Sequence, residues 1–240
     1  MSNHSAYRTF VYRLSKTKDS VREKSTKKRK SLGLRTAREN LDDLVDPGSF
    51  LEFGAFAVAA QRNRRDYEEL QLETSADGIL TGFCNINEDE VGEDNSHAAA
   101  IIYDYSVLAG SQGFFHHQKL DRICEKAEEF SLPVVIFTEG GGGRPGDTDV
   151  TTQIAGLHIP SFSTWARLTG KCLKIAVNNG YCFAGNAVLF GCSDFMIATK
   201  QSWIGMAGPA MIEGGGLGVY DPKEIGPAEE QYKNGVLDYL

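Results

Sequence analysis

The 240-residue sequence has no run of some 18 apolar residues, and we therefore expect no membrane-spanning helix. Its first residues lack the charged, apolar and small-residue order of a secretory signal. We expect a cytoplasmic protein, with a mitochondrial location left open because the start is rich in Lys and Arg. The five cysteines form no CxxC pair and have no histidine cluster nearby, which favours reduced thiols over a zinc site. We therefore expect no metal.

Positive charge is concentrated at the start of the chain. The net charge is −7, yet residues 1–35 carry eleven Lys or Arg against two acids, a local charge of +9. This basic N-terminal segment is either a solvated terminus or an anion site, for the phosphates of a nucleotide-like ligand or for nucleic acid. No aromatic interleaving or known nucleic-acid module accompanies the charge, so we expect no nucleic-acid partner.

Strand-like and helix-like patterns alternate along the rest of the chain. The spacing predicts a helix over 36–45, a hairpin from strands at 78–87 and 96–110, and a helix over 111–130 capped by Ser111. Three further strands are expected at 132–139, 172–179 and 193–199, separated by helix-like stretches at 151–170 and 185–193. This alternation favours an α/β fold with a mixed, mainly parallel sheet covered by helices.

Glycine clusters follow two of these strands, TEGGGGRPGD at 138–147 and NNGYCFAGN at 178–186. Ligands bind beyond the carboxyl ends of parallel strands, so both clusters fall where a site is expected. Neither cluster has the spacing of a phosphate-binding loop, and the GxSxG of a hydrolase elbow is absent. The pair His116-His117 lacks the four-residue spacing of a two-histidine metal face, and we expect at least one of the two on the helix surface.

Backbone N–H donors are the chemistry that the clusters offer. Glycine has no Cβ, so its loop can approach a ligand closely, and the first N–H groups of a helix have no partner within the helix. Two such donors from neighbouring loops can hold one carbonyl oxygen as it gains negative charge. A tight turn is the alternative for one cluster alone. Two clusters at successive strand ends favour the oxyanion hypothesis.

The chain resembles, in several ordered motifs, the N-terminal half of the carboxyltransferase component of biotin-dependent acyl-CoA carboxylases. The motifs begin with LRTARENLDDLVDPGSFLEFG, ADGILTGFCNINEDEVG and YDYSVLAGSQGFFHHQKLDRICEKAEEFSLPVVIFTEGGGGRPGD, and end with IGMAGPAMIEG and EIGPAEEQYKNGVLDYL. The stretch NNGYCFAGNAVLFGCSDFMIAT resembles the second oxyanion segment of the ClpP/crotonase superfamily. The resemblance runs from about Leu34 to the last residue. It implies a crotonase-like ββα spiral core in a domain of residues 36–240, preceded by an N-terminal helical segment.

The resemblance also implies a reaction. A carboxyl group moves from carboxybiotin to the α-carbon of an acyl-CoA through an oxyanion-stabilised enolate, and the ureido nitrogen of biotin removes the α-proton. The implied donors are the N–H groups of Gly142 or Gly143 and of Gly185, next to Asn186. Arg144 is either a ligand contact or a clamp on its own loop, and we expect Glu139 and Asp147 to be exposed acids without a role. The expected cationic contacts for the phosphates of CoA are Lys27, Lys28, Arg29, Lys30, Arg35 and Arg38.

Members of the resembled family are usually about twice as long. The resemblance therefore implies a C-terminal carboxyltransferase half, a biotinyl carrier, a biotin carboxylase component and a homo- or hetero-oligomer. Two other functions stay open: a biotin-dependent decarboxylase subunit that runs the transfer in reverse, and a non-catalytic acyl-CoA-binding subunit. A hydratase or isomerase of the same superfamily is disfavoured, because glycine and asparagine stand where those enzymes place carboxylates. A zinc-ribbon acetyl-CoA carboxylase β subunit is disfavoured by the lack of paired CxxC motifs.

Overall fold

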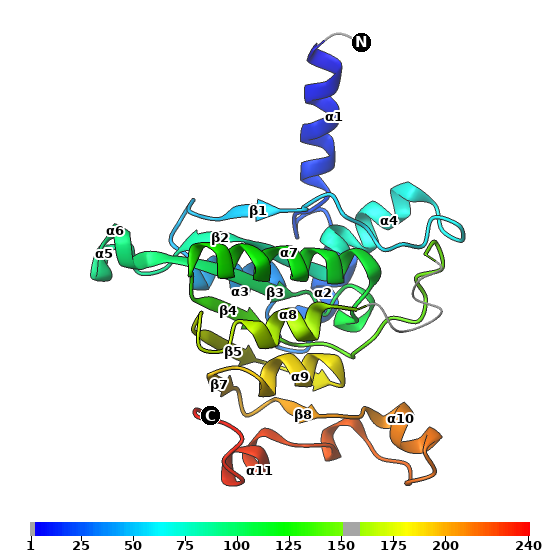
Figure 1. Ribbon diagram of the computed structural model, residues 1–240. Coiled ribbons are helices and arrows are strands. Elements are labelled where there is room, and N and C mark those ends of the chain that lie inside the picture. The colour runs from blue at the N-terminus through cyan, green and yellow to red at the C-terminus, as the bar shows by residue number, and fades with distance from the viewer. Residues whose placement is uncertain (1–2, 151–158) are drawn as a thin grey trace.

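The computed structural model describes residues 3–150 and 159–240, which form an α/β fold around a six-stranded sheet (Figure 1). The strand order is β1-β2-β3-β4-β5-β7, and β6 pairs with β8 in a separate two-stranded sheet. The β1–β2 and β2–β3 pairs are antiparallel, and all the others are parallel. This confirms the predicted mixed, mainly parallel sheet. The strands are β1 (Leu51–Phe53), β2 (Ile79–Asn85), β3 (His97–Tyr103), β4 (Val134–Phe137), β5 (Lys174–Asn178), β6 (Tyr181–Phe183), β7 (Phe195–Ala198) and β8 (Trp203–Gly205).

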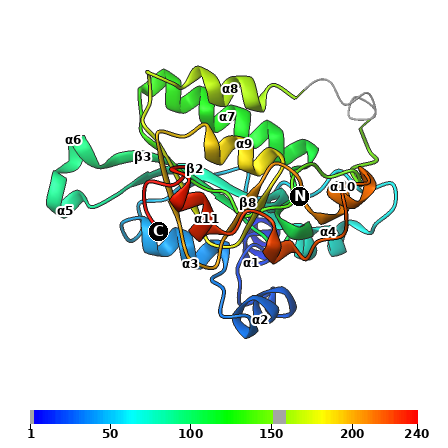
Figure 2. The same ribbon diagram turned by 90° about the horizontal axis from the view of Figure 1, so that it is seen from below.

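Helices cover both faces of the six-stranded sheet (Figure 2). One face carries α7 (Phe114–Phe130), α8 (Ser161–Arg167) and α9 (Gly185–Gly191), and the other carries α3 (Ala37–Leu44). Helix α2 (Glu23–Ser31) stands farther from the sheet and contacts the residues that follow β3 and β4. Successive side chains of β3 point to opposite faces, and both faces are apolar: Ile101 belongs to the core cluster under α7, and Ile102 to the cluster under α3. The buried apolar run of β3 therefore serves two cores.

The predicted helix at 36–45 is confirmed as α3. Thr36 caps it, because its Oγ1 accepts from the Glu39 N–H at 3.1 Å and the Glu39 carboxylate accepts from the Thr36 N–H at 2.9 Å. The predicted hairpin of β2 and β3 is also confirmed. Its acidic connection folds into two short helices, α5 (Glu88–Val91) and α6 (Glu93–Ser96).

The prediction that Ser111 caps the helix over 111–130 is wrong. Helix α7 begins after Gly113, and the Ser111 hydroxyl donates to the Leu108 carbonyl oxygen at 2.6 Å instead. Two carboxylates from outside the helix accept the first N–H groups: Asp147 accepts from Phe114 at 2.9 Å, and Asp77 accepts from His116 at 2.7 Å. These distant partners leave no local sequence signal.

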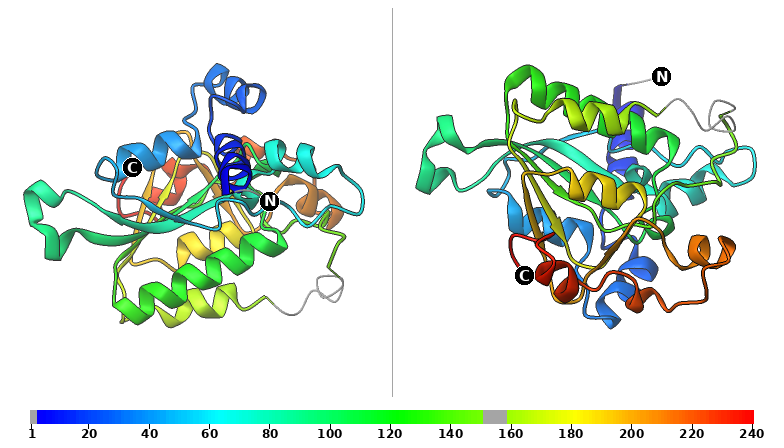
Figure 3. Two further views of the ribbon diagram at one scale, coloured as in Figure 1. Left: turned by 90° about the horizontal axis from the view of Figure 1, so that it is seen from above. Right: turned by 60° about the horizontal axis from the view of Figure 1, so that its bottom comes forward.

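The N-terminal segment is helical, as predicted, and α1 (Asn3–Ser15) projects away from the body (Figures 1 and 3). The predicted helix-like stretch at 151–170 contains α8, and its residues 151–158 lie outside the described residues. Within residues 3–150 and 159–240, no helix has the length and apolar character needed to cross a membrane. The other helices in the described part of the chain are α4 (Tyr67–Glu73), α10 (Pro209–Gly214), α11 (Ala228–Lys233) and the 3₁₀ turns at Ser75–Gly78, Leu108–Gly110 and Pro222–Glu224.

Candidate functional site

The two glycine clusters lie side by side beyond the ends of β4 and β5. The Gly140 N–H donates to the Tyr181 carbonyl oxygen at 2.7 Å, and the Phe183 N–H donates to the Gly140 carbonyl oxygen at 2.9 Å. A Cβ added to Gly142 would lie 2.7 Å from the Cβ of Ala184 and 3.8 Å from the nitrogen of Gly185. The parallel arrangement of β4 and β5 therefore brings together loops that are about forty residues apart in the sequence.

The N–H group of Gly142 is already occupied. It donates to Oδ1 of Asn186 at 3.0 Å, and Nδ2 of Asn186 donates to the Thr138 carbonyl oxygen at 3.1 Å. The fully buried Asn186 side chain therefore fastens the first glycine loop to the start of α9. The sequence left Gly142 and Gly143 as alternative donors, and the N–H group of Gly142 has this acceptor in the structure.

The N–H group of Gly143 points away from Gln112, the residue beside it in the neighbouring segment. Gly143 forms a parallel bridge with Gln112, in which the Gln112 N–H donates to the Gly142 carbonyl oxygen at 2.7 Å and the Arg144 N–H donates to the Gln112 carbonyl oxygen at 3.0 Å. In such a bridge, the middle residue directs its own N–H away from the partner. Among the described residues nothing accepts the Gly143 N–H, and a Cβ there would meet no atom within 4 Å.

Gly185 supplies a second N–H group without an acceptor among the described residues. It is the first residue of α9, so its N–H has no partner within the helix. The preceding Ala184 has φ 53° and ψ −123°, an unusual conformation for a residue with a Cβ. A Cβ on Gly185 would lie 2.3 Å from Oε1 of Gln112 and 3.0 Å from Cζ of Phe162. Only glycine fits here without movement of its neighbours.

Arg144 fastens its loop to two segments that are distant in the sequence, at Asp77 and Ser111. Its Nη1 pairs with the Asp77 carboxylate, its Nη2 donates to the Ser111 carbonyl oxygen at 2.7 Å, and its side chain is buried. The hypothesis of a clamp on the carbonyl oxygens of the glycine loop is not met among the described residues, because the carbonyl oxygens that Arg144 contacts belong to Asp77 and Ser111, outside that loop. Burial raises the pKa of the Asp77 carboxyl, and the Arg144 guanidinium opposes that shift.

The expectation that Asp147 and Glu139 are exposed acids is wrong, because both are buried and paired. Asp147 accepts from Nε2 of Gln61 at 3.0 Å and, as described above, from the start of α7. Glu139 accepts two hydrogen bonds from Arg29, at 2.8 and 2.6 Å. Burial raises the pKa of Glu139, and Arg29 opposes the shift. Composition and spacing gave no sign of these long-range partners.

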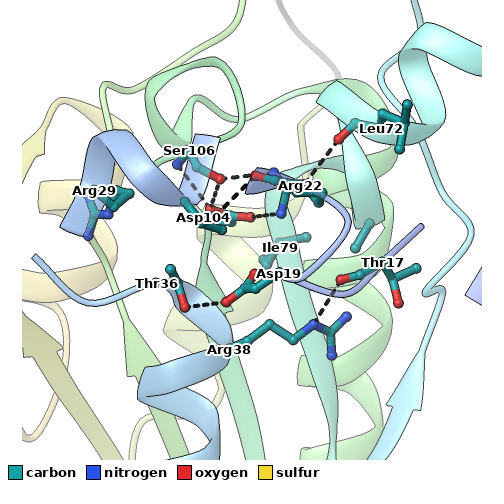
Figure 4. Close-up of polar contacts among 12 residues, drawn as sticks. Thr17, Asp19, Arg22, Arg29, Thr36, Arg38, Leu72, Ile79, Asp104 and Ser106 are labelled. Carbon is teal, nitrogen blue, oxygen red and sulfur yellow. Dashed lines mark hydrogen bonds and ion pairs between the residues drawn. The ribbon is translucent and has the colours of Figure 1, made fainter. Parts of the chain in front are cut away.

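Two buried arginines fasten α2 to the edge of the sheet where the glycine loops lie. Arg29 reaches Glu139 after β4, and Arg22 donates to Asp104 after β3 at 2.7 Å and to Ser106 at 2.9 Å (Figure 4). Arg29 was an expected CoA contact, but its guanidinium is buried in the pair with Glu139 and in contacts with the Arg35 carbonyl oxygen. Its observed contacts therefore connect α2 to the first glycine loop.

The other expected cationic contacts divide into paired and unpaired groups. Arg38 donates to Glu52 at 2.8 and 3.1 Å and also contacts the Thr17 carbonyl oxygen (Figure 4). Arg35 pairs with Asp43 at 2.9 Å, and Lys30 pairs with Glu39 at 3.2 Å. Lys27 and Lys28 are exposed, and neither has an ion pair among the described residues.

A cavity of about 610 Å³ lies between α2 and the glycine loops. It is lined by Glu139 of the first loop and by Ala109. The carbonyl oxygen of Ala109 accepts a hydrogen bond from the Gly141 N–H of that loop at 3.0 Å. Sequence reasoning missed the aromatic wall of the cavity, in which Tyr181 and Trp203 are paired across β6 and β8 with ring centroids 5.0 Å apart. Its other relevant lining residues are the apolar Leu32, Leu34 and Leu108, the aromatic Tyr105, and the cationic Lys24, Lys28 and Lys223.

No metal site accompanies this cavity or the loops in the part of the chain that the structure describes: no three His, Cys, Asp or Glu side chains gather there to hold an ion. The described residues offer backbone N–H donors, cationic side chains and an apolar wall.

Residues 28–240 match the carboxyl transferase domain family. The chain belongs to this family.

The relatives of this carboxyl transferase domain support the predicted family and fold. It is 31% identical to the methylmalonyl-CoA carboxyltransferase 12S subunit of Propionibacterium freudenreichii subsp. shermanii, over 80% of this chain and 34% of that subunit. It is 30% identical to the biotin-dependent long chain acyl-coenzyme A carboxylase beta4 subunit of Mycobacterium tuberculosis, over 84% of this chain and 35% of the relative. The chain thus spans about a third of the length of these curated relatives.

The structure superposes on part of a solved single-chain, multi-domain long-chain acyl-CoA carboxylase with a TM-score of 0.92. The two share 49% sequence identity over 98% of this chain and 23% of that one. A transcarboxylase 12S structure gives a TM-score of 0.77 at 26% identity, over 99% of this chain and 44% of that chain. These matches confirm the predicted crotonase-like fold. The boundary between residues 35 and 36 stays a prediction, and the family match begins at residue 28.

Both histidines of α7 are buried, so the expectation that one lies on the surface of the carboxyl transferase domain is wrong. Nδ1 of His117 lies 2.8 Å from Oγ of Ser161. Burial, with a smaller effect from Arg144, lowers the pKa of His117 to about 4, and burial also lowers the pKa of His116. The folded domain therefore keeps both rings neutral under conditions in which an unfolded chain would protonate them.

This difference predicts a pH dependence of stability. Between pH 6.5 and about 4 the unfolded chain binds a proton at His117 that the folded chain does not bind, so the free energy of unfolding should fall as the pH falls. His117→Gln should weaken this dependence without abolishing it, because His116 contributes as well. Urea unfolding between pH 4.5 and 7 tests this, with the exposed His97→Gln as control. Parallel curves for His117→Gln and wild type would contradict it.

Proposed function

We propose that this carboxyl transferase domain binds an acyl-CoA and stabilises its enolate while a carboxyl group is transferred between carboxybiotin and the α-carbon. The observation that supports this most is the pair of N–H groups of Gly143 and Gly185, which lie in adjacent loops and have no acceptor among the described residues. A thioester oxygen between them would gain two hydrogen bonds that strengthen as it becomes negative. The proposal assigns Gly142 and Asn186 to holding this geometry.

Biotin fits this proposal as a group presented by a carrier. When bound, carboxybiotin supplies the carboxyl group and the ureido nitrogen that takes up the α-proton. The residues of this chain would bind and orient the acyl-CoA, and the glycine loops present backbone donors to it. Gly143 is exposed and open, which suits the approach of a second substrate from solvent.

The cavity beside α2 is the proposed position of the nucleotide end of CoA. Tyr105, Tyr181 and Trp203 offer aromatic surface, and Lys24 and Lys28 offer charge for phosphates. We expect Arg29, Arg38 and Arg144 to stabilise the fold and not to bind CoA. Each guanidinium group already forms an ion pair, Arg29 with Glu139, Arg38 with Glu52 and Arg144 with Asp77. Of the cationic residues expected from the sequence, Lys28 is the one that lines the cavity unpaired.

Lys28→Ala should therefore raise the KM for acyl-CoA by about 2- to 5-fold at low salt, the scale of one exposed charge contact. The effect should shrink at 0.5 M salt, because exposed charges are screened. Lys126→Ala, which changes a partly exposed lysine on α7 outside the lining of the cavity, is the control. Steady-state kinetics at two salt concentrations give the result, and an equal change in both variants would argue against the assignment.

The complete reaction requires partners. The chain spans about a third of its curated relatives, and we propose that a C-terminal carboxyltransferase half, a biotinyl carrier and a biotin carboxylase component complete the system, in a homo- or hetero-oligomer. The related 12S transcarboxylase is described as a hexamer. A decarboxylase subunit is the second candidate, since the chain is also 28% identical to the methylmalonyl-CoA decarboxylase subunit alpha of Veillonella parvula.

A carboxyl-transfer assay tests the proposal. The domain is assembled with a C-terminal half and a biotinylated carrier, and acetyl-, propionyl- and long-chain acyl-CoA are compared as acceptors. We expect transfer to at least one of them. Transfer only from a carboxylated CoA ester to biotin would favour the decarboxylase subunit. Binding of acyl-CoA without transfer in either direction would support the non-catalytic alternative.

A further inference from the structure

Gln112 lies between the two donor loops and contacts both of them. Its backbone N–H and carbonyl oxygen hold the first loop, through the hydrogen bonds with Gly142 at 2.7 Å and Arg144 at 3.0 Å. The residue is 3% exposed and lies two positions before the first residue of α7, so the first loop is fastened to a buried part of the fold. These two bonds determine where the N–H of Gly143 points.

The side chain of Gln112 reaches the second loop. Its Nε2 donates to the Tyr103 hydroxyl at 2.9 Å, and its Oε1 lies 2.3 Å from the position that a Cβ of Gly185 would take. Tyr103 ends β3 and is itself buried, with its ring centroid 4.5 Å from that of His116. The hydrogen bond to Tyr103 thus fixes the amide, and the fixed amide packs directly against the backbone of Gly185.

We infer that Gln112 is a positioning residue that fixes the distance and direction between the N–H groups of Gly143 and Gly185. Through its backbone it sets one donor, and through its side chain, held by Tyr103, it sets the other. The inference rests on the proposed oxyanion function of these donors. A displacement of about 1 Å in such a site costs about 100-fold in rate, so the support for the donors matters as much as their presence.

The test uses the domain assembled with its C-terminal half and biotinylated carrier, with propionyl-CoA and a long-chain acyl-CoA as substrates. Gln112→Met keeps the length of the side chain but removes its hydrogen bond, and Gln112→Glu places a negative charge beside the donors. Tyr103→Phe removes only the hydroxyl that holds the amide, which keeps the test valid if a Gln112 variant does not fold. Gln118→Met, an exposed glutamine on α7, is the control.

We expect kcat to fall about 10- to 100-fold in both Gln112 variants, with the KM for acyl-CoA changed less than about 2-fold. Tyr103→Phe should lower kcat about 3- to 10-fold, the effect of one lost buried hydrogen bond, and Gln118→Met should match wild type. If Gln112 served only to stabilise the fold, its variants would contain fewer folded molecules, and each folded molecule would keep the wild-type kcat. Wild-type kcat in the folded variants, or a rise in KM alone, would overturn the inference. An inactive wild type would instead overturn the proposed function and the inference with it.

Discussion

Gly143→Pro should lower kcat for carboxyl transfer by about 100- to 1,000-fold, the usual cost of losing one oxyanion donor. Proline has no N–H, and residue 143 is a position where the N–H makes no hydrogen bond among the described residues. The residue is exposed and has no atom within 4 Å of an added Cβ, so a side chain at this position meets no neighbour. The KM for acyl-CoA should change little, because the donor acts mainly on the charge that develops after binding.

Gly143→Ala is the matched control for this prediction. It adds a Cβ to the same open position but keeps the N–H, so its kcat should stay close to that of wild type. The pair therefore separates the donor from the shape of the loop. If Gly143→Pro and Gly143→Ala lose activity equally, or if neither loses it, the Gly143 N–H is not the donor.

Arg144→Met should destabilise the fold by about 3 to 5 kcal/mol, the cost of leaving a buried partner charge uncompensated. Asp77 is fully buried, and Arg144 is the cation that pairs with it. Asp77 and the preceding Ala76 also have positive φ angles, 50° and 53°, so the surrounding contacts must hold a strained backbone in place. Urea unfolding of wild type and variant gives the difference directly.

Two further variants make this second prediction specific. The double variant Asp77→Asn with Arg144→Met removes the orphaned charge and should recover part of the lost stability. Lys126→Met breaks the exposed pair with Glu129 and should cost less than about 1 kcal/mol. An Arg144→Met variant as stable as Lys126→Met would show that the buried pair does not hold the loop.

Local patterns were sufficient to predict most of the fold. The helix α3 follows from the helical spacing of its apolar residues, and the strands β4 and β5 follow from short apolar runs of the kind buried in parallel sheets. The juxtaposition of the two glycine clusters also follows from sequence, because successive parallel strands end at the same edge. These features depend on neighbouring residues and on a general rule of sheet topology.

The parts that sequence reasoning missed depend on contacts between distant residues. Arg29 and Glu139 are 110 positions apart, and nothing local distinguishes a buried partner from a solvated charge. The same holds for Asp147, whose partner Gln61 lies 86 positions away. It also holds for the start of α7, where the carboxylate of Asp147, and not the hydroxyl of Ser111, accepts the hydrogen bond from the first N–H group. The proposal of Gly143 over Gly142 as the donor rests on the position of the Asn186 side chain, which accepts from the Gly142 N–H.

The most direct test of the central claim removes the N–H of Gly185 without adding an atom. A side chain at this position would collide with Gln112, so a semisynthetic chain with an ester oxygen in place of the residue 185 nitrogen is the appropriate variant. Carboxyl transfer to acyl-CoA should fall about 100- to 1,000-fold in kcat, with the KM nearly unchanged. A semisynthetic chain with the ester that transfers carboxyl groups as fast as the all-amide chain would contradict the claim that backbone N–H groups of the two loops stabilise the enolate.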